Sequence, residues 1–188
     1  MDYFLSIDQG TTSTRSILFE QSGNIKSSHQ VEFKQIFPDN KSVEHDAIEI
    51  LETVKTSIRN VTKDIDVKSI KSVGITNQRE TTVAWSKTTG MPLYNAIVWQ
   101  DTRTQDICDE LVADKDLSVY FDKTGLPVAT YFSLSKILWL IRNVPDIKKT
   151  LDTDVCFGTI DSWLIYNLTG NYYTDCLLYT SDAADDRL

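Results

Sequence analysis

The residues best suited to chemistry form a polar segment near the amino terminus, between two apolar runs: Asp8-Gln9-Gly10-Thr11-Thr12-Ser13-Thr14-Arg15. A glycine lets backbone N–H groups approach phosphate oxygens closely, and the hydroxyls of Thr11, Thr12 and Ser13 add short donors. Asp8 supplies a carboxylate that holds Mg²⁺ directly or through water, and Arg15 supplies a forked donor for a phosphate. The segment therefore predicts a polyphosphate site, with an ordinary polar hairpin loop as the alternative.

A second polar pair, Arg79 and Glu80, follows an apolar run at 70–76. Neighbouring side chains of a regular strand face opposite sides, so Arg79 and Glu80 can contact one ligand only where the regular strand ends. The polar residues Asn77 and Gln78 make such an end plausible directly before the pair. A hydroxyl both donates and accepts hydrogen bonds, so a guanidinium beside a carboxylate suits a polyol. The pair predicts a polyol site, and a solvated surface pair is the alternative.

Trp99 and Tyr131 stand at the ends of expected elements, where aromatic residues usually cover a core or a surface. Asp101 and Arg103 are interpreted as a pair that helps to hold a site, with a simple Asp at a helix start as the alternative. The other aromatic and histidine residues are interpreted without a chemical role: Trp85, Trp139 and Trp163 as structural, Tyr120 and Phe121 as core, His29 and His45 as surface residues.

The elements that position these residues begin with three antiparallel strands, which end near residue 33. A helix is expected from Asp46 on, with Glu49 completing an acidic capping box and with one apolar face. Further strands are expected at 70–76, 81–86, 95–99 and 155–158, and further helices at 103–113, 133–144 and 162–168, the second of them stopped by Pro145. This order indicates an α/β domain with a mixed sheet.

Composition excludes several classes of protein. The chain has 188 residues, 41% hydrophobic and 24% charged, which is typical of a globular protein with one core and part of a second. A net charge of −8 argues against nucleic acid or an anionic membrane as the main partner, because both require basic patches. Three scattered cysteines and two histidines indicate neither a disulfide framework nor a His/Cys metal site. With no signal-peptide pattern and no membrane-length apolar run, the cytoplasm is the expected compartment.

Four stretches together resemble the FGGY carbohydrate kinases and, within them, the glycerol kinases. They are 8–13, 74–82 with Asn-Gln-Arg-Glu-Thr-Thr, 94–103 with Trp-x-Asp-x-Arg, and 124–126 with the Tyr-Phe-Ser at 131–133. The first stretch alone is shared by the whole actin/Hsp70/sugar-kinase superfamily, whereas the four together are more specific. The resemblance implies the ribonuclease-H-like α/β fold of that superfamily, with antiparallel opening strands and a mixed sheet.

By this resemblance, the activity is ATP-dependent phosphorylation of glycerol to sn-glycerol 3-phosphate, with ATP and Mg²⁺ as cofactors. The resemblance assigns the ATP phosphates to Thr11, Thr12, Ser13 and Arg15, the metal to Asp8, and glycerol to Arg79, Glu80, Trp99 and Tyr131. Both groups are expected to line one cleft. The family's catalytic base is expected downstream of residue 188, so the chain by itself is expected to have little or no kinase activity.

The resemblance runs from residue 1 to 175 and predicts an incomplete FGGY amino-terminal domain, followed by an unrelated, disordered or artefactual tail at 176–188. The full-length protein is expected to be a homo-oligomer that binds glycerol and ATP, without nucleic acid and without membrane insertion. Three alternatives stay open: another FGGY sugar or polyol kinase, a chaperone-like or cytoskeletal ATPase with the same phosphate turn, and a non-catalytic fragment.

Overall fold

The computed structural model describes residues 1–113 and 118–174, which divide into two compact units. Unit 1 contains Met1–Gln35 and Asp46–Gln78. Unit 2 contains Ile36–His45 and the described residues from Arg79 onward. The tail predicted at 176–188 lies outside the described residues.

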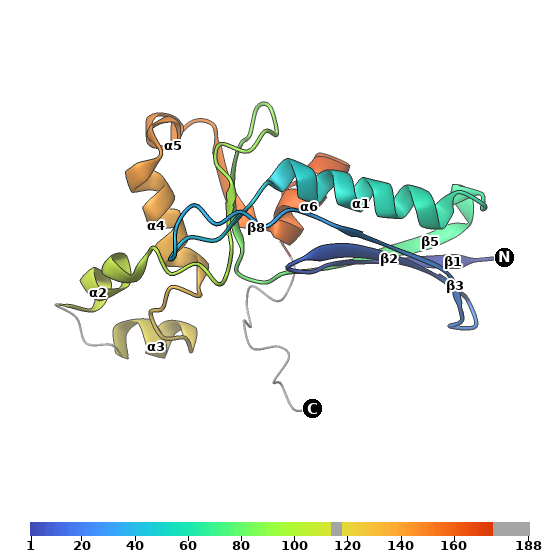
Figure 1. The fold of residues 1–188 in the computed structure, drawn as a ribbon, viewed down its shortest axis with the longest axis horizontal. Helices are drawn as coiled ribbons and strands as arrows, with labels where there is room; N and C mark the ends of the chain where they lie inside the picture. Colours follow the sequence, from blue (N-terminus) through green and yellow to red (C-terminus); the bar gives the residue numbers. More distant parts are fainter. Residues whose placement is uncertain (114–117, 175–188) are drawn as a thin grey trace. The chain divides into compact units, whose positions relative to one another are not determined.

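Unit 1 is a four-stranded sheet covered by one long helix (Figure 1). In spatial order its strands are β3 (Ile25–Glu32), β2 (Ser13–Glu20), β1 (Tyr3–Gln9) and β5 (Ile70–Asn77). The first three are antiparallel neighbours, as predicted, while β5 pairs in parallel with β1, so the sheet is mixed. The helix α1 (Ala47–Thr62) and the short 3-10 turn η1 (Val67–Ser69) form the crossover that a parallel pair requires.

The start of α1 confirms Asp46 as its cap. The Asp46 side chain accepts hydrogen bonds from the backbone N–H groups of Ile48 and Glu49, which the first helical turn would otherwise leave without a partner. The Glu49 carboxylate accepts from the backbone N–H of Lys34. Asp46 therefore caps the helix as predicted. Glu49, the other residue of the predicted capping box, instead bonds to the chain that follows β3.

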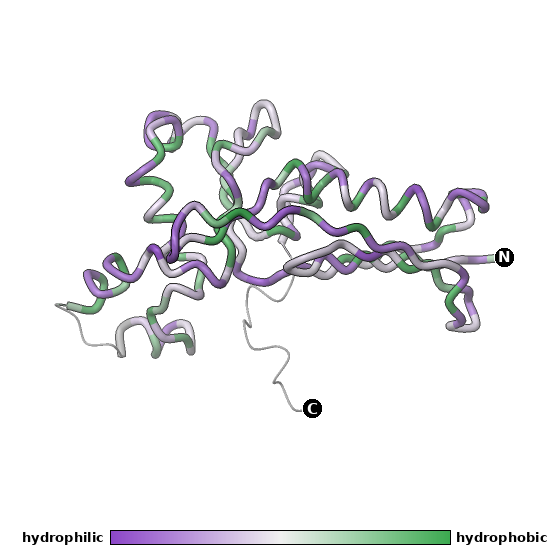
Figure 2. Tube along the Cα trace, viewed as in Figure 1, coloured by the Kyte–Doolittle hydropathy of each residue, from purple (hydrophilic) through white to green (hydrophobic). Residues whose placement is uncertain are grey.

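The packing of α1 against β2 combines an apolar face with two buried hydroxyl pairs. Figure 2 shows hydrophobic and hydrophilic residues alternating by turns along α1, and Ile50, Leu51 and Val54 are buried on its inner face. Between helix and strand, the hydroxyls of Thr14 and Thr53 lie 2.8 Å apart, and those of Ser16 and Ser57 lie 2.7 Å apart, all four residues being buried. Each hydroxyl thus keeps a partner inside the core.

Unit 2 contains a second four-stranded sheet with helices around it (Figure 1). In spatial order the strands are β4 (Glu44–His45), β7 (Ala96–Ile97), β6 (Thr82–Ser86) and β8 (Val155–Thr159), all antiparallel to their neighbours. Its helices are α2 (Gln105–Ala113), α3 (Ser118–Thr124), α4 (Ser133–Asn143), α5 (Pro145–Thr150) and α6 (Ile160–Thr169). The short helix α5 was not predicted. Pro145 ends α4 as expected, and it then serves as the first residue of a new helix, where its missing N–H costs nothing.

The core of unit 2 corrects two sequence predictions. Ala84, Ile97 and Leu140 are buried together, and Trp85 packs edge-on against Trp163, which supports the structural interpretation of these two tryptophans. Phe121 was predicted in the core, but 56% of its surface is exposed on α3. His45 was predicted at the surface, but it is fully buried, because the two-residue strand β4 pairs with β7 inside the unit.

Among the residues that the structure describes, no helix combines the length and the apolar character that crossing a membrane requires.

Candidate functional site

The predicted phosphate turn joins β1 and β2 in unit 1. The backbone N–H of Gly10 donates to the carbonyl of Ser13 at 2.9 Å, which closes the turn. The backbone of Gly10 does not adopt the left-handed conformation that favours glycine. A Cβ at this position would lie 3.4 Å from the Ser13 carbonyl oxygen, which is an ordinary contact. The protein itself does not require a glycine here. A requirement for glycine would have to come from a ligand approaching the backbone.

Two buried glutamines hold this turn, and no sequence pattern predicted this role for either of them. The Gln9 side chain donates to the Gly10 carbonyl at 2.7 Å. The Gln78 side chain, which directly follows β5, donates to the Gln9 amide oxygen at 3.1 Å and to the Gly10 carbonyl at 3.3 Å. Gln9 and Gln78 are 0% and 5% exposed, so these bonds are shielded from water. The turn is therefore held in place by the residue that follows β5, the strand that pairs in parallel with β1.

The side chains predicted to bind phosphate differ in how they are held. Thr11 and Ser13 are partly buried and Thr12 is exposed. The Ser13 hydroxyl accepts from the Gln30 amide at 3.0 Å, and the Arg15 Nε donates to the same amide's oxygen at 3.2 Å. Gln30 on β3 thus joins Ser13 and Arg15 on one face of the sheet. This is the face opposite the buried residues that contact α1, because side chains alternate along a strand.

Asp8, the predicted magnesium ligand, is exposed at the end of β1 and is the cross-strand partner of Arg15. Within the described residues there is no cluster of three or more His, Cys, Asp or Glu side chains that could enclose a metal ion. A single exposed carboxylate beside a phosphate turn fits Mg²⁺, which keeps several waters and takes its other ligands from phosphate oxygens.

The predicted polyol pair lies in a turn between β5 and β6, as the expected break in the strand requires. Arg79 is partly buried, whereas Glu80 is 9% exposed. Glu80 has φ of 63°, a left-handed conformation that is uncommon for residues other than glycine. Such a conformation costs free energy and persists where its surroundings demand it, often at a binding site.

The Glu80 carboxylate lies at the first turn of α4. Its Oε2 atom accepts from the backbone N–H of Ser133 at 3.0 Å and from the Ser133 hydroxyl at 2.9 Å. The partial positive charge of a helix amino terminus stabilises a carboxylate at this place. Both donors reach the same carboxylate oxygen, and this fixes the orientation of the Glu80 carboxylate.

The aromatic residues predicted for the same ligand, Trp99 and Tyr131, contact each other through their rings. The rings of Trp99 and Tyr131 have centroids 5.8 Å apart at 64°, and the ring of Phe132 lies 5.1 Å from that of Tyr131 at 84°. The backbone N–H of Trp99 donates to the hydroxyl of Thr81 at 3.2 Å, which holds Trp99 beside the turn of Glu80. Glu80, Trp99 and Tyr131 are thus brought together within unit 2.

The predicted pair of Asp101 and Arg103 is part of a larger buried network. Both Asp101 oxygens accept from the Arg103 Nε, at 3.0 and 2.9 Å, and Arg103 Nη1 lies 2.8 Å from Glu44 Oε1. Arg103 Nη2 is 2.8 Å from Asp101 Oδ2, outside the direction of a hydrogen bond. The Tyr94 hydroxyl donates to Glu44 at 2.9 Å, and the guanidinium stacks 4.7 Å from the ring centre of Trp139.

The charged groups of this network are stabilised by one another inside unit 2. Burial lowers the pKa of the Arg103 guanidinium, but its bonds to Asp101 and Glu44 outweigh burial and raise the pKa above its usual value. Asp101 also accepts from the backbone N–H of Val43 at 2.7 Å. The network therefore joins the segment of β4 to the start of α2, close in sequence to Trp99.

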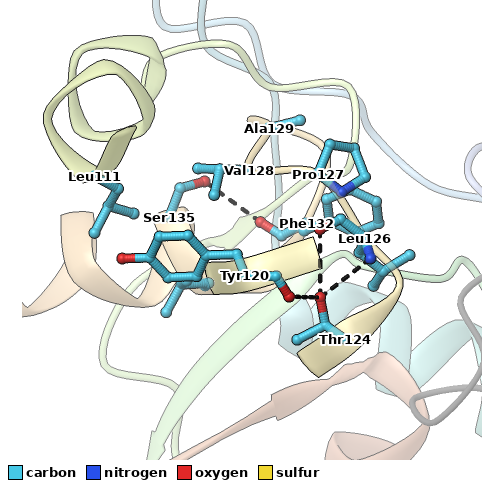
Figure 3. Close-up of a pocket in the computed structure, with 10 residues that line it drawn as sticks. Leu111, Tyr120, Thr124, Leu126, Pro127, Val128, Ala129, Phe132 and Ser135 are labelled. Carbon is cyan, nitrogen blue, oxygen red and sulfur yellow. Dashed lines mark hydrogen bonds between the residues drawn. The ribbon is translucent and has the colours of Figure 1, made fainter. Parts of the chain in front are cut away.

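An apolar pocket of about 110 Å³ has Phe132 in its lining (Figure 3). Its lining comes from α2, α3, the following loop and α4, and includes Leu111, Tyr120, Leu126, Pro127 and Leu134. The Thr124 hydroxyl in its wall bonds to the carbonyls of Tyr120 and Leu126 and to the N–H of Leu126, so its polar groups are used within the wall. The lining of the pocket is mainly apolar.

The prediction that the phosphate turn and the polyol group line one cleft stays a prediction. Four residues to which the sequence assigned no such role hold the predicted ones: Gln9 and Lys136 through contacts close in sequence, Gln78 and Ser133 through contacts between distant parts of the chain.

Comparison with known proteins agrees with this architecture. Residues 3–184 match the FGGY family of carbohydrate kinases, N-terminal domain. The chain is 47% identical over 186 residues to the glycerol kinase of Clavibacter michiganensis subsp. michiganensis, covering 97% of this chain and 36% of that protein. It is 52% identical over 171 residues to the glycerol kinase of Pseudarthrobacter chlorophenolicus, covering 89% and 34%. The chain therefore spans about a third of the length of the curated relatives it matches.

The crystal structure of Plasmodium falciparum glycerol kinase with ADP is similar to this chain, with a TM-score of 0.86 and 41% sequence identity, covering 93% of this chain and 36% of that one. The α/β fold with a mixed sheet, expected for the actin/Hsp70/sugar-kinase superfamily, is confirmed. The family match extends beyond the boundary predicted at residue 175, and that boundary stays a prediction. From the family match and the shared fold together, we conclude that the chain belongs to the FGGY family of carbohydrate kinases.

Proposed function

We propose that the chain contributes the phosphate-binding and glycerol-binding residues of a kinase that transfers a phosphoryl group from ATP to glycerol, giving sn-glycerol 3-phosphate. Thr11, Thr12, Ser13 and Arg15 bind the phosphates of the nucleotide, and Asp8 holds Mg²⁺ directly or through water. Arg79, Glu80, Trp99 and Tyr131 bind glycerol. The full-length protein is proposed to be a cytoplasmic homo-oligomer.

The observation that carries the proposal is the arrangement of Glu80. Its carboxylate is oriented by Ser133 at the amino end of α4, and its backbone is held in a left-handed conformation. One oriented oxygen accepts from a hydroxyl, and the faces of Trp99 and Tyr131 offer apolar contact to the C–H groups of a short polyol. The partly buried guanidinium of Arg79 adds the donors that hydroxyl oxygens require.

The named relatives support glycerol as the acceptor and a nucleotide as the donor. The two relatives above are named glycerol kinase, and the similar solved structure is a glycerol kinase with ADP. Phosphoryl transfer depends mainly on positioning and on neutralising phosphate charge, and Mg²⁺ supplies part of that neutralisation when bound. The chain's residues are proposed to orient the two substrates, while the group that accepts the hydroxyl proton is proposed to lie downstream of residue 188.

The test is a titration of the 188-residue chain with glycerol, followed by two-dimensional amide NMR and by Trp fluorescence. Glu80→Gln keeps an acceptor for Ser133 but removes the charge, and we expect glycerol affinity to fall by about tenfold or more. Glu110→Gln is the matched control, because Glu110 is exposed and lies in α2. Equal affinities of Glu80→Gln and the unchanged chain would contradict the assigned site.

A panel of polyols and ketoses separates glycerol from the substrates of other FGGY kinases. We expect glycerol to shift the amide signals of Glu80 and Ser133 at lower concentration than xylitol or xylulose does. The same chain, supplied with ATP, Mg²⁺ and glycerol, is expected to form little or no glycerol 3-phosphate. Binding of a ketose in preference to glycerol would favour another sugar kinase, and the absence of any polyol binding would reject the proposed site in this chain.

A further inference from the structure

Lys136, in the first turns of α4, is fully buried although it carries an ammonium group. Its Nζ atom donates to the backbone carbonyls of Thr130 and Tyr131, both at 2.6 Å, and to that of Phe132 at 3.3 Å. An ammonium has three N–H donors, so these three carbonyls use all of them. The group thus binds the segment that immediately precedes its own helix.

The segment that Lys136 binds contains Tyr131, one of the residues predicted to bind the polyol, and leads directly into Ser133. Tyr131 contacts Trp99 through its ring while its carbonyl accepts from Lys136. The next residue in the chain after Phe132 is Ser133, whose N–H and hydroxyl orient the Glu80 carboxylate. The position of Tyr131 and the donors to Glu80 therefore both depend on the course of the backbone through 130–133.

The burial of this lysine is not explained by packing alone. Transfer of an ammonium from water into a protein interior is costly, and an apolar side chain of similar length would fill the same volume. Burial lowers the pKa of Lys136 to about 8, while interaction with the nearby titratable groups of Glu80, Asp101 and Cys108 acts in the opposite direction. A charge that lowers the stability of the folded chain is typical of positions where function requires it.

We infer that Lys136 is a positioning residue for polyol binding, which fixes the backbone of 130–132 so that Tyr131 faces Trp99 and Ser133 meets Glu80. The inference rests on the proposed glycerol site. Lys136 acts through the backbone and not by touching the ligand. Its ammonium form makes three bonds to carbonyls, whereas the neutral amine has one donor fewer.

The first test needs no ligand. Amide hydrogen exchange of the unliganded chain compares Lys136→Met with the unchanged protein and with Lys148→Met, an exposed lysine of α5. We expect protection of the Ser133 amide to fall by about tenfold or more in Lys136→Met, while strand β6 keeps its protection. Unchanged protection at 131–133 would overturn the inference whether or not glycerol binds.

The second test uses glycerol affinity between pH 6 and pH 9. In the unchanged chain, we expect affinity to fall as pH rises through about 8, where Lys136 loses its proton. Lys136→Arg keeps the charge and is expected to keep affinity across this range, whereas Lys136→Met is expected to bind weakly at every pH. Tight, pH-dependent binding by Lys136→Met would assign the pH effect to another group and reject the inference.

The outcomes separate this inference from the proposed function. If the unchanged chain does not bind glycerol, the proposed site fails, and hydrogen exchange still decides whether Lys136 orders the segment. If glycerol binds and Lys136→Met binds equally well, the site stands and the inference fails. Should Lys136→Met not fold, the pH dependence of Ser133 protection in the unchanged chain, corrected for intrinsic exchange, replaces it as the deciding measurement.

Discussion

The phosphate turn of unit 1 and the polyol group of unit 2 are built in different ways. The turn closes through a hydrogen bond between Gly10 and Ser13, three positions apart, and carries the small hydroxyls of Thr11, Thr12 and Ser13, of which Thr12 is exposed. The group of residues predicted to bind the polyol (Arg79, Glu80, Trp99 and Tyr131) depends on the contact between Glu80 and Ser133, which are 53 positions apart, and on buried charges. Local backbone hydrogen bonding closes the turn, with uncharged amide side chains behind it, whereas buried charges hold the second region.

This difference predicts that substitutions affect the two regions unequally. A turn made of backbone hydrogen bonds loses little stability when one side chain changes. A region that contains buried charges loses much more when one partner is removed, because the other charge is left in a low dielectric without compensation. We therefore expect the largest effects in unit 2.

The largest effect is expected for Arg103→Ala. This change leaves Asp101 and Glu44 buried without their cation, at 0% and 3% exposure. We expect the free energy of unfolding to fall by about 3 to 5 kcal/mol, measured by urea denaturation. The same experiment on Arg142→Ala breaks an ion pair with Glu110 that is exposed to solvent, and the expected loss is much smaller because water screens the two charges. Similar losses in both variants would show that burial does not set the strength of this network.

The next largest effect is a dependence of stability on acidic pH caused by His45. Burial lowers the pKa of His45 from 6.5 to about 4. Below pH 6.5 the unfolded chain therefore binds a proton that the folded chain does not, so stability is lost as pH falls from about 6.5 to about 4. The loss from this residue reaches about 3 kcal/mol.

Urea denaturation of the unchanged chain and of His45→Gln, repeated between pH 4 and pH 7, measures this contribution. The acidic carboxylates titrate in both proteins, so the difference between their stabilities isolates His45. We expect the difference to change steadily across this range. A constant difference would mean that the buried imidazole accepts a proton as easily as one in water does.

The same contrast explains what the sequence could reveal. The opening hairpin and the cap at Asp46 were predicted because turn chemistry and helix capping act within a few residues. The adjacency of Asp101 and Arg103 was predicted for the same reason. Arg79 and Glu80 were predicted in a turn, since a polar run after an apolar strand marks its end.

The burial of individual polar residues could not be predicted, because it depends on which distant segments pack together. His45 sits in a polar run, yet pairing of β4 with β7 encloses it. Lys136 lies in a helix that was predicted from its sequence pattern, but its buried ammonium bonds to carbonyls that no spacing rule identifies. The prediction for Phe121 was wrong in the opposite direction: its apolar side chain predicted burial, but it is exposed on α3.

A smaller effect is expected in unit 1 for Gln78→Leu. The change removes the donor to the Gln9 amide oxygen and to the Gly10 carbonyl, both in a buried setting. We expect a loss of stability of about 1 to 2 kcal/mol and faster hydrogen exchange at Gly10. Gln21→Leu, in the exposed turn after β2, serves as the control. If Gly10 exchange is equal in both variants, Gln78 does not hold the turn.

The smallest effect on stability is expected for Gly10→Ala, which also separates protein from ligand requirements. The added Cβ meets only an ordinary contact with Ser13, and the backbone is not left-handed. Replacing glycine by alanine at such a position stabilises proteins by about 0.4 to 1 kcal/mol, because the unfolded chain loses freedom. If phosphate groups approach this backbone, binding of MgATP, followed by ³¹P NMR, weakens although stability does not fall. Unchanged binding of MgATP would mean that the nucleotide does not approach the backbone at Gly10, and the remaining support for the turn would rest on its hydroxyls and Arg15.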